Sequence, residues 1–411
     1  MNLPLLRPLA HRPTALLWAG LAGAAIGDEL FRVVLGYVAV RTLGPDAGYL
    51  AVAQAVATLA ALVLAARQLD RTPPLRVMLG ADLARAAALA GLAVVWAVQG
   101  APPAWALFAV IVVLGAGLAA FRPAMQAALP VLAGDRAMLP AANALMDTTE
   151  RLARLAGPGL LVLAAALLAE VHFVTVNVAT FLLSAVAVVL IARTGTGLAT
   201  VPAAAGVGSL WAAAVRGVRA VRGHGLLRFM LPAAALQNGV WVACFYLALP
   251  LHLERGLGTG GLAAFGVVIA AYGVGNLGAT LVLGNLGLPA RPARRVFMGI
   301  LLFGGATAAM AGAMLLPQEW QVPALALCAA IAAVGAPMQD IVVATLRQTD
   351  LPRDDIAPAV RAHMVSVQLG AVVTMLAAPT LVASVGTAWV MLGGGAVYLA
   401  IGALGLVRVR G

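Results

Sequence analysis

The sequence predicts an all-α polytopic membrane protein with twelve transmembrane helices in two pseudo-symmetric six-helix bundles. Its composition is 63% hydrophobic and only 10% charged, which leaves too little polar surface to cover a water-soluble chain of 411 residues. Twelve apolar segments follow one another, nearly all with the roughly 20 residues that a helix needs to cross a bilayer. The connections between them alternate between arginine-bearing and arginine-poor.

Each apolar segment is expected to be helical because a chain inside lipid must satisfy its backbone hydrogen bonds within the segment. The first six segments cover residues 14–40, 47–66, 75–98, 104–128, 139–169 and 173–192. The second six cover residues 226–253, 262–286, 296–316, 322–346, 360–383 and 388–407.

One longer polar connection separates the two sets. It predicts a first bundle over residues 1–193, a cytoplasmic linker over 194–225 and a second bundle over 226–411. Residues 194–208 are rich in Gly, Ala and Thr, as flexible linkers are. The rest of the linker predicts an amphipathic helix on an anionic leaflet. Its apolar face holds Val215, Val218 and Val221, and its basic face holds Arg216, Arg219 and Arg222.

The basic residues indicate the orientation. All 26 are Arg, and most lie near the two termini, in alternate connections and in the linker, whereas Arg41 and Arg255 lie on the opposite side. Since positive charge stays inside, both termini are expected in the cytoplasm. The net charge of +11 is spread along the chain, so no nucleic-acid partner is expected. Abundant Ala without Lys is typical of a bacterial protein, here of the inner membrane.

Several motifs carry a family resemblance. They are Pro130-Val131-Leu132, Ala142-Asn143-Ala144-Leu145, Gly157-Pro158-Gly159 and Ala179-Thr180-Phe181-Leu182-Leu183-Ser184. With the helix count, they resemble the major facilitator superfamily, in the branch of drug, macrolide and siderophore exporters. The resemblance implies a secondary transporter rather than an enzyme. It also implies a monomer without cofactor or metal, whose partners are the lipid bilayer, a small-molecule substrate and protons.

Two motifs of that superfamily imply gating residues. Asp70 and Arg71 stand where the family has its Asp-Arg turn between the second and third helices, which steadies the outward-open state. Gly157 and Pro158 match the family's antiporter motif in the fifth helix, which is associated with export. Proline kinks a helix and glycine admits a close neighbour, so this pair can act as a pivot.

The first helix carries three charged residues, and each costs on the order of 3 kcal/mol near the bilayer centre. Asp28 and Glu29 lie four and three residues before Arg32, so either carboxylate can pair with the guanidinium. The remaining carboxyl group would favour its neutral form when buried, as proton coupling requires. We therefore expect Asp28 or Glu29 to be the proton-coupling or cation-contact site. An ion pair that only aligns the first helix is the alternative.

Other polar and aromatic residues lie deep in apolar segments. Arg122 in the fourth helix and Asp340 in the tenth are expected to face the central cavity and to contact substrate or each other. Trp241 and Asn238 in the seventh helix are expected near the bilayer midplane, where transporters bind substrate. These residues complete the predicted proton-coupling or substrate cavity.

Other charged residues have a structural interpretation. Asp82 and Arg85 stand near the start of the third helix and are expected at the membrane interface. Glu150 and Arg154 form a four-residue pair in the favourable acid-first order.

The predicted activity is proton-coupled efflux of a small amphiphile, such as a drug, a macrolide-like metabolite or a siderophore, by alternating access. A transporter of lysophospholipid with the same fold is an alternative. A polytopic membrane enzyme is a further one, although the connections are short and carry few acidic or histidine residues. No P-loop, zinc site or Ser-His-Asp set is recognisable.

Overall fold

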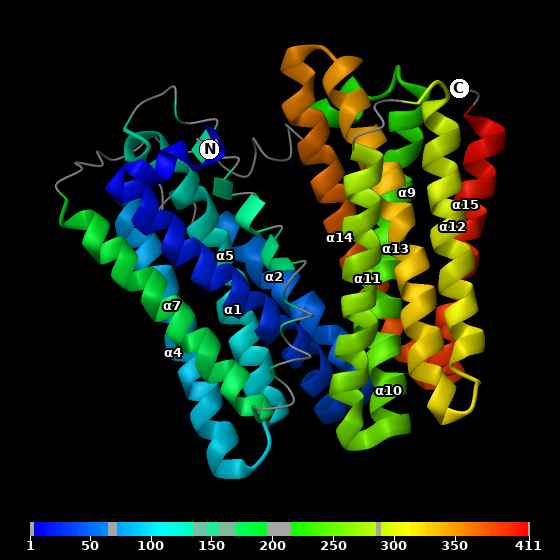
Figure 1. The fold of residues 1–411 in the computed structure, drawn as a ribbon, viewed down its shortest axis with the longest axis horizontal. Helices are drawn as coiled ribbons and strands as arrows, with labels where there is room; N and C mark the ends of the chain where they lie inside the picture. Colours follow the sequence, from blue (N-terminus) through cyan, green and yellow to red (C-terminus); the bar gives the residue numbers. More distant parts are fainter. Residues whose placement is uncertain are drawn as a thin grey trace. The chain divides into compact units, whose positions relative to one another are not determined.

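Helices account for all the regular structure in the described part of this computed structural model, which covers residues 4–64, 72–134, 168–194, 215–284 and 289–409 with short pieces between 138 and 164. In chain order the first elements are η1 (Pro4–Ala10), α1 (Arg12–Leu43), η2 (Gly44–Ala47), α2 (Gly48–Leu64), α4 (Pro74–Gln99), α5 (Ala104–Leu132) and α7 (Glu170–Ala192) (Figure 1). They are followed by α9 (Gly225–Val242), η4 (Ala243–Ala248), α10 (Leu249–Leu257), η5 (Gly258–Gly260), α11 (Gly261–Gly284), α12 (Pro292–Ala313), α13 (Gln318–Thr349), α14 (Arg353–Val385) and α15 (Thr387–Arg408).

Nine helical stretches among the described residues are long and apolar enough to cross a membrane, with α9, η4 and α10 counted as one continuous stretch. α1 is not among these nine, although its 32 residues exceed what a bilayer requires, because it carries Asp28, Glu29 and Arg32. The prediction of an all-α polytopic membrane protein is confirmed.

The chain divides into two compact units. Unit 1 contains residues Met1–Leu35 and Ala53–Val207, and unit 2 contains Gly36–Val52 and Gly208–Gly411. The longer first part of α1 therefore belongs to unit 1, and its last turns belong to unit 2. In unit 1, α4 packs against both α5 and α7. The core of unit 1 includes Leu17, Met78, Phe121, Leu129, Leu132 and Ile191.

In unit 2, α12 packs against α13 and α15, α11 against α13, and α9 against α14. Small residues allow these helices to approach closely, as is usual for helices in lipid. A Cβ atom added at Gly304 of α12 would lie 2.9 Å from the carbonyl oxygen of Gly395 on α15. On α14, a Cβ atom at Gly370 would overlap the backbone of Ala235 on α9. Larger residues at these points would force the helices apart.

η4 is a π-helical turn between α9 and α10. The backbone N–H of Leu249 donates to the carbonyl of Cys244, five residues back. Pro250 follows at once; its ring has no N–H to donate and would clash with a carbonyl four residues back. Widening the preceding turn relieves that clash. π-turns are rare and often lie at functional sites.

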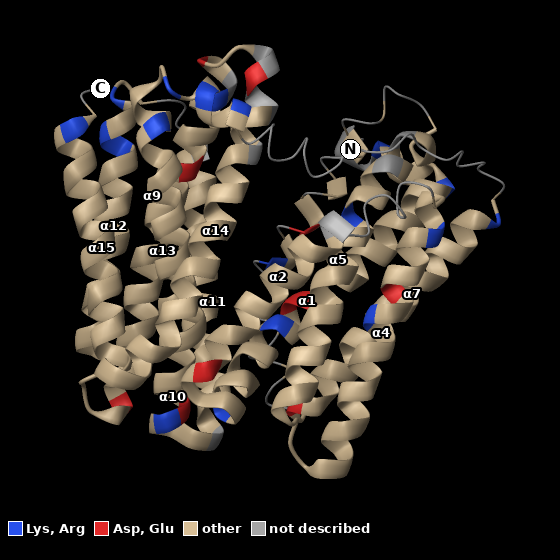
Figure 2. Ribbon diagram, turned by 180° about the vertical axis from the view of Figure 1, so that it is seen from behind, with Lys and Arg blue, Asp and Glu red and all other residues tan. Residues whose placement is uncertain are grey.

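Arginine residues, blue in Figure 2, gather at one end of each unit, the end at which α4, α9 and α12 begin and α7 and α15 finish. At this end of unit 2, His224 caps α9 by accepting the N–H of Leu227 and lies 3.0 Å from Asp350, just after α13. The Thr349 hydroxyl and His224 hold the pKa of the Asp350 carboxyl below its usual range. The contact ties the start of α9 to the end of α13.

Candidate functional site

A seam of glycines joins α1 to α7 in unit 1. A Cβ atom at Gly20 would lie 3.1 Å from the Cα of Ser184, and one at Gly23 would lie 3.2 Å from the Leu183 side chain. At Gly27 the two helices are closer still, and a Cβ atom there would overlap the Thr180 side chain. The two helices thus touch along the half of α1 that leads to Asp28.

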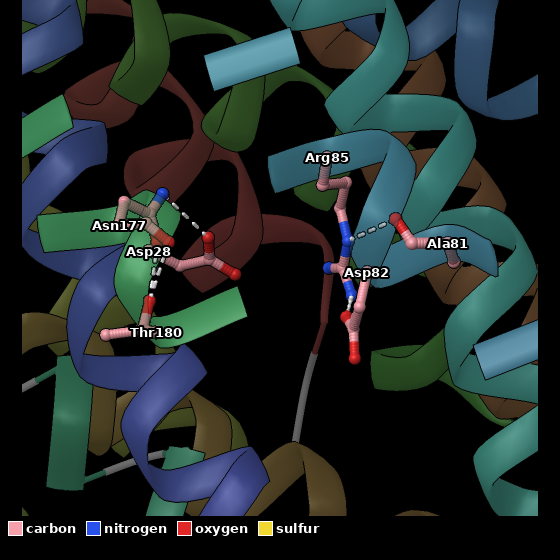
Figure 3. Close-up of polar contacts among 6 residues, drawn as sticks. All are labelled: Asp28, Ala81, Asp82, Arg85, Asn177 and Thr180. Atoms are coloured by element: carbon pink, nitrogen blue, oxygen red, sulfur yellow. Dashed lines mark hydrogen bonds and ion pairs between the residues drawn. The ribbon is translucent and has the colours of Figure 1, made fainter. Parts of the chain in front are cut away.

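Asp28 lies next to this seam and contacts a polar group from α7 (Figure 3). The side-chain amide of Asn177 donates to the Asp28 carboxylate at 3.2 Å. The Thr180 hydroxyl lies 3.0 Å from the amide oxygen of Asn177 and donates to it, which leaves the amide nitrogen pointing at Asp28. Asn177 is fully buried and Asp28 is partly buried. Within the described residues no arginine forms an ion pair with Asp28.

Glu29, the next residue, has a charged partner, unlike Asp28. Its carboxylate forms an ion pair with Arg32 one turn further along α1, and only 6% of Glu29 is exposed. Gly157, in the predicted pivot of the fifth segment, lies directly against the Glu29 side chain, where a Cβ atom would overlap it. The missing side chain at Gly157 therefore makes the space that Glu29 occupies.

A second charged pair lies in α4. Asp82 and Arg85 form an ion pair and are 0% and 4% exposed, so both are enclosed by the protein. Asp82 follows the first residue of α4 by about two helical turns, roughly 12 Å. The second carboxylate oxygen of Asp82 has no hydrogen-bond partner among the described residues.

Aromatic rings and a glycine hold the Arg85 side chain in place. The guanidinium carbon lies 4.2 Å from the ring centroid of Phe181 on α7 and 4.9 Å from that of Phe121 on α5. Cation–π contacts of this kind stabilise a desolvated guanidinium by about 2 kcal/mol. A Cβ atom at Gly117 would lie 2.7 Å from the Arg85 side chain, so α5 leaves room for it.

The two groups shown in Figure 3 interact electrostatically. The charges of Arg85 and Asp82 both act on Asp28, with Arg85 favouring its ionised form and Asp82 opposing it. Unit 1 therefore holds a buried ion pair beside a carboxyl group that has only a neutral partner. Such a carboxyl group can take up and release a proton without breaking an ion pair of its own.

Arg122, expected to contact substrate or Asp340, forms an ion pair with Glu150. Arg154 lies 3.8 Å from the same carboxylate, as the acid-first spacing predicted. The Arg122 side chain is 49% exposed, so its contact with Glu150 is weakened by solvent. Arg122 therefore shares the single carboxylate of Glu150 with Arg154.

Unit 2 contains a cluster of aromatic rings around Trp241. The ring of Trp241 lies 5.1 Å from that of Tyr246 and 6.2 Å from that of Phe245. Tyr272 of α11 is 5.3 Å from Phe245. Behind them, Phe303 of α12 and Tyr398 of α15 stack at 4.4 Å. Phe245, Phe303 and Tyr398 are buried, whereas Trp241, Tyr246 and Tyr272 are partly exposed and can present ring faces to a ligand.

Asp340 of α13 is exposed and interacts electrostatically with Tyr272 of this cluster. Its carboxylate accepts a hydrogen bond from Gln339 at 3.3 Å, and no ion pair to it occurs among the described residues. Asn238, by contrast, donates to the carbonyl of Val367 on α14 at 3.1 Å, which ties α9 to α14. Arg347, also on α13, interacts electrostatically with Asp340. Aromatic faces next to a carboxylate form a surface suited to an organic cation.

Three of the predicted gating residues, Asp70, Arg71 and Pro158, lie outside the described residues. The two cysteines, Cys244 and Cys328, are free thiols. No group of three His, Cys, Asp or Glu side chains that could hold a metal ion occurs within the part of the chain that the structure describes.

Known proteins of similar structure are membrane transporters. A crystal structure of a POT family transporter in complex with a thioalcohol-conjugated peptide is 14% identical, with a TM-score of 0.70 and 96% of each chain covered. The E. coli fucose:proton symporter is 14% identical, with a TM-score of 0.54 over 97% of this chain and 99% of that chain. A bacterial metal transporter is 13% identical, with a TM-score of 0.65 over 97% and 98%. No curated protein matches the sequence.

The helical fold, with nine stretches among the described residues long and apolar enough to cross a membrane, defines the chain as a multi-pass membrane protein. The sequence model of the Major Facilitator Superfamily matches residues 17–359. The chain belongs to that superfamily.

Changing Gly27 to Ala is expected to destabilise unit 1 by about 1–3 kcal/mol, as overpacking does. The added methyl group would overlap Thr180 and would lie 2.8 Å from the Asn177 side chain that contacts Asp28. Gly91→Ala in α4 is a matched control, because nothing lies within 4 Å of a Cβ atom there. Thermal unfolding of the purified variants measures the difference. Equal unfolding temperatures for the two variants would contradict the close contact of α1 with α7.

Proposed function

We propose that this chain is a proton-coupled exporter of a small amphiphilic compound in the bacterial inner membrane, working by alternating access. The observation that carries the proposal is the state of Asp28. Its neighbour Glu29 is neutralised by Arg32, whereas Asp28 accepts one hydrogen bond from the neutral amide of Asn177. Burial favours the neutral form of such a carboxyl group, so protonation removes a costly charge when the helix moves.

In this proposal the chain's own residues perform three tasks. Asp28 holds and releases the proton at its carboxylate oxygens. Asn177, oriented by Thr180, keeps that carboxyl group in place in both protonation states, since a protonated carboxyl group still has an oxygen that accepts from the amide N–H. The Arg85 charge favours release, because it stabilises the ionised form of Asp28.

The substrate side of the proposal rests on unit 2. Trp241, Tyr246 and Tyr272 offer aromatic faces. Asp340 offers a negative charge, which Arg347 offsets in part without forming an ion pair with it. Together they favour a cationic aromatic compound over an anionic one. Export is supported by the resemblance of the fifth segment to the family's antiporter motif. The arginine-rich end of each unit is proposed to face the cytoplasm.

Transport into sealed vesicles tests this function. Purified protein is reconstituted, the membrane potential is clamped, and a pH gradient is imposed with ethidium, a permanently cationic aromatic dye, as the probe. We expect the dye to move against its gradient toward the side with the higher proton concentration, as antiport requires. Movement that ignores the pH gradient would contradict proton coupling. Movement with the protons would contradict export.

In the same assay, Asp340→Asn is expected to raise the KM for ethidium about tenfold, the effect of losing roughly 1.4 kcal/mol of charge attraction. The KM for a neutral aromatic dye should not change. Asp350→Asn, just after the same helix, is the matched control and should behave as the unmodified protein does. An equal loss for the cationic and the neutral dye would contradict a role for the Asp340 charge.

A further inference from the structure

A groove of about 380 Å³ lies in unit 2 between the linker helix, residues 215–220, and helices α9 and α14. None of the residues of the proposed transport site lines it. Its walls are apolar and are formed by Val215, Val218, Leu231, Val365 and Leu369. Arg219 and Arg222 also line it, and none of its described lining residues is acidic. The groove thus combines an apolar interior with two cationic groups.

The linker helix is fixed to α14 at the wall of this groove. A Cβ atom at Gly217 would overlap the carbonyl of Pro358 and would lie 2.8 Å from the Ala362 side chain. Val221 is buried, whereas Val218 is 39% exposed and lines the groove. The valines predicted to share one apolar face therefore have different surroundings. The Ser366 hydroxyl of α14 donates to the Leu231 carbonyl of α9 at 2.7 Å. This hydrogen bond connects the two helices that form the other walls of the groove.

The apolar lining continues along α14. Leu369 is 49% exposed, and Val373 and Leu376 on the same helical face are also exposed. An extended hydrocarbon chain can lie along this strip with one end in the groove. The cationic end of the groove lies at the arginine-rich end of unit 2, near the starts of α9 and α12.

We propose that the groove binds an anionic phospholipid, with the phosphate at Arg219 and Arg222 and an acyl chain along Leu231, Leu369 and the α14 strip. Charge selects this occupant over a zwitterionic lipid, because no carboxylate is among the described residues that line the groove beside the two guanidinium groups. The apolar walls select a lipid over a free phosphate compound. This inference does not depend on which substrate is transported.

The test is a titration of delipidated, full-length protein in detergent with phosphatidylglycerol, followed by native mass spectrometry. Arg219→Gln combined with Arg222→Gln is expected to weaken binding about 30-fold, since each arginine near an anionic headgroup contributes about 1 kcal/mol. The matched control is Arg216→Gln combined with Arg228→Gln, which removes two exposed arginines from the same end of unit 2 without touching the groove. This control should bind as the unmodified protein does.

A third variant separates the apolar contribution from the charge. Leu369→Trp fills the groove while both arginines remain, and it should weaken phosphatidylglycerol binding at an unchanged unfolding temperature. Glycerol 3-phosphate should not compete. The proposal is overturned if the control variant loses as much binding as the groove variant, if phosphatidylcholine binds equally well, or if glycerol 3-phosphate displaces the lipid.

Discussion

Replacing Asp28 with Asn is expected to abolish proton-driven transport while substrate exchange across the membrane continues. Asparagine keeps the size of the side chain and the contact with Asn177, but it cannot bind and release a proton. Without the proton the pH gradient no longer drives net movement, and we expect the initial rate of gradient-driven ethidium transport to fall by about 100-fold, a loss of roughly 2.7 kcal/mol. Exchange of labelled for unlabelled dye without a gradient is the second measurement.

Glu29→Gln is the matched variant, because it neutralises the adjacent carboxyl group. Glu29 is already paired with Arg32, so this change should lower stability but leave the response to the pH gradient in place. If Glu29→Gln removes the response and Asp28→Asn preserves it, the roles of the two carboxyl groups are reversed and the proposal for Asp28 is wrong.

Arg85→Met is expected to destabilise unit 1 by about 3–5 kcal/mol. Asp82 is fully buried, and without the guanidinium its charge would have no compensation. Methionine is long and apolar, so it can still fill the space between Phe121 and Phe181. The measurement is the free energy of unfolding in mixed detergent micelles.

The double variant, Asp82→Asn with Arg85→Met, distinguishes the effect on stability of removing the whole ion pair from that of removing one partner. Removing both charges should recover most of the stability, because an apolar replacement of a buried ion pair is often neutral or better. Arg85→Lys should be intermediate, since it keeps the charge but loses the planar contact with the two rings. A double variant as unstable as Arg85→Met would show that the uncompensated Asp82 charge is not the cause.

Hydropathy alone predicted the helical membrane fold, because lipid allows few other structures for segments of this length. The same reasoning does not reveal how deeply Asp82 and Arg85 are buried within the protein. Hydropathy places them near the start of an apolar segment, whereas α4 begins at Pro74 and encloses both side chains about two turns further on. The aromatic contacts and the space at Gly117 that hold Arg85 come from α5 and α7, which local spacing does not reveal.

The candidate site was predicted only in part for a similar reason. Three charged residues in α1 were recognisable, but spacing left both Asp28 and Glu29 as partners for Arg32. Asn177, which contacts Asp28, was missed, although a single amide within the apolar α7 was a usable signal. Trp241 was recognised, whereas its partner Tyr272 comes from another helix. The partner of Arg122, Glu150, lies 28 residues away in the sequence, where helical spacing cannot reveal it.

The widened turn at η4 changes which side chains share a face of the seventh membrane stretch. In a regular α-helix a residue meets those three and four positions on, yet Trp241 contacts both Phe245 and Tyr246, four and five positions on. The turn therefore accommodates one extra residue. When this stretch is aligned with a transporter whose helix is regular, a gap of one position is required near Ala248; otherwise the side chains of α10 are assigned to the wrong side of the helix.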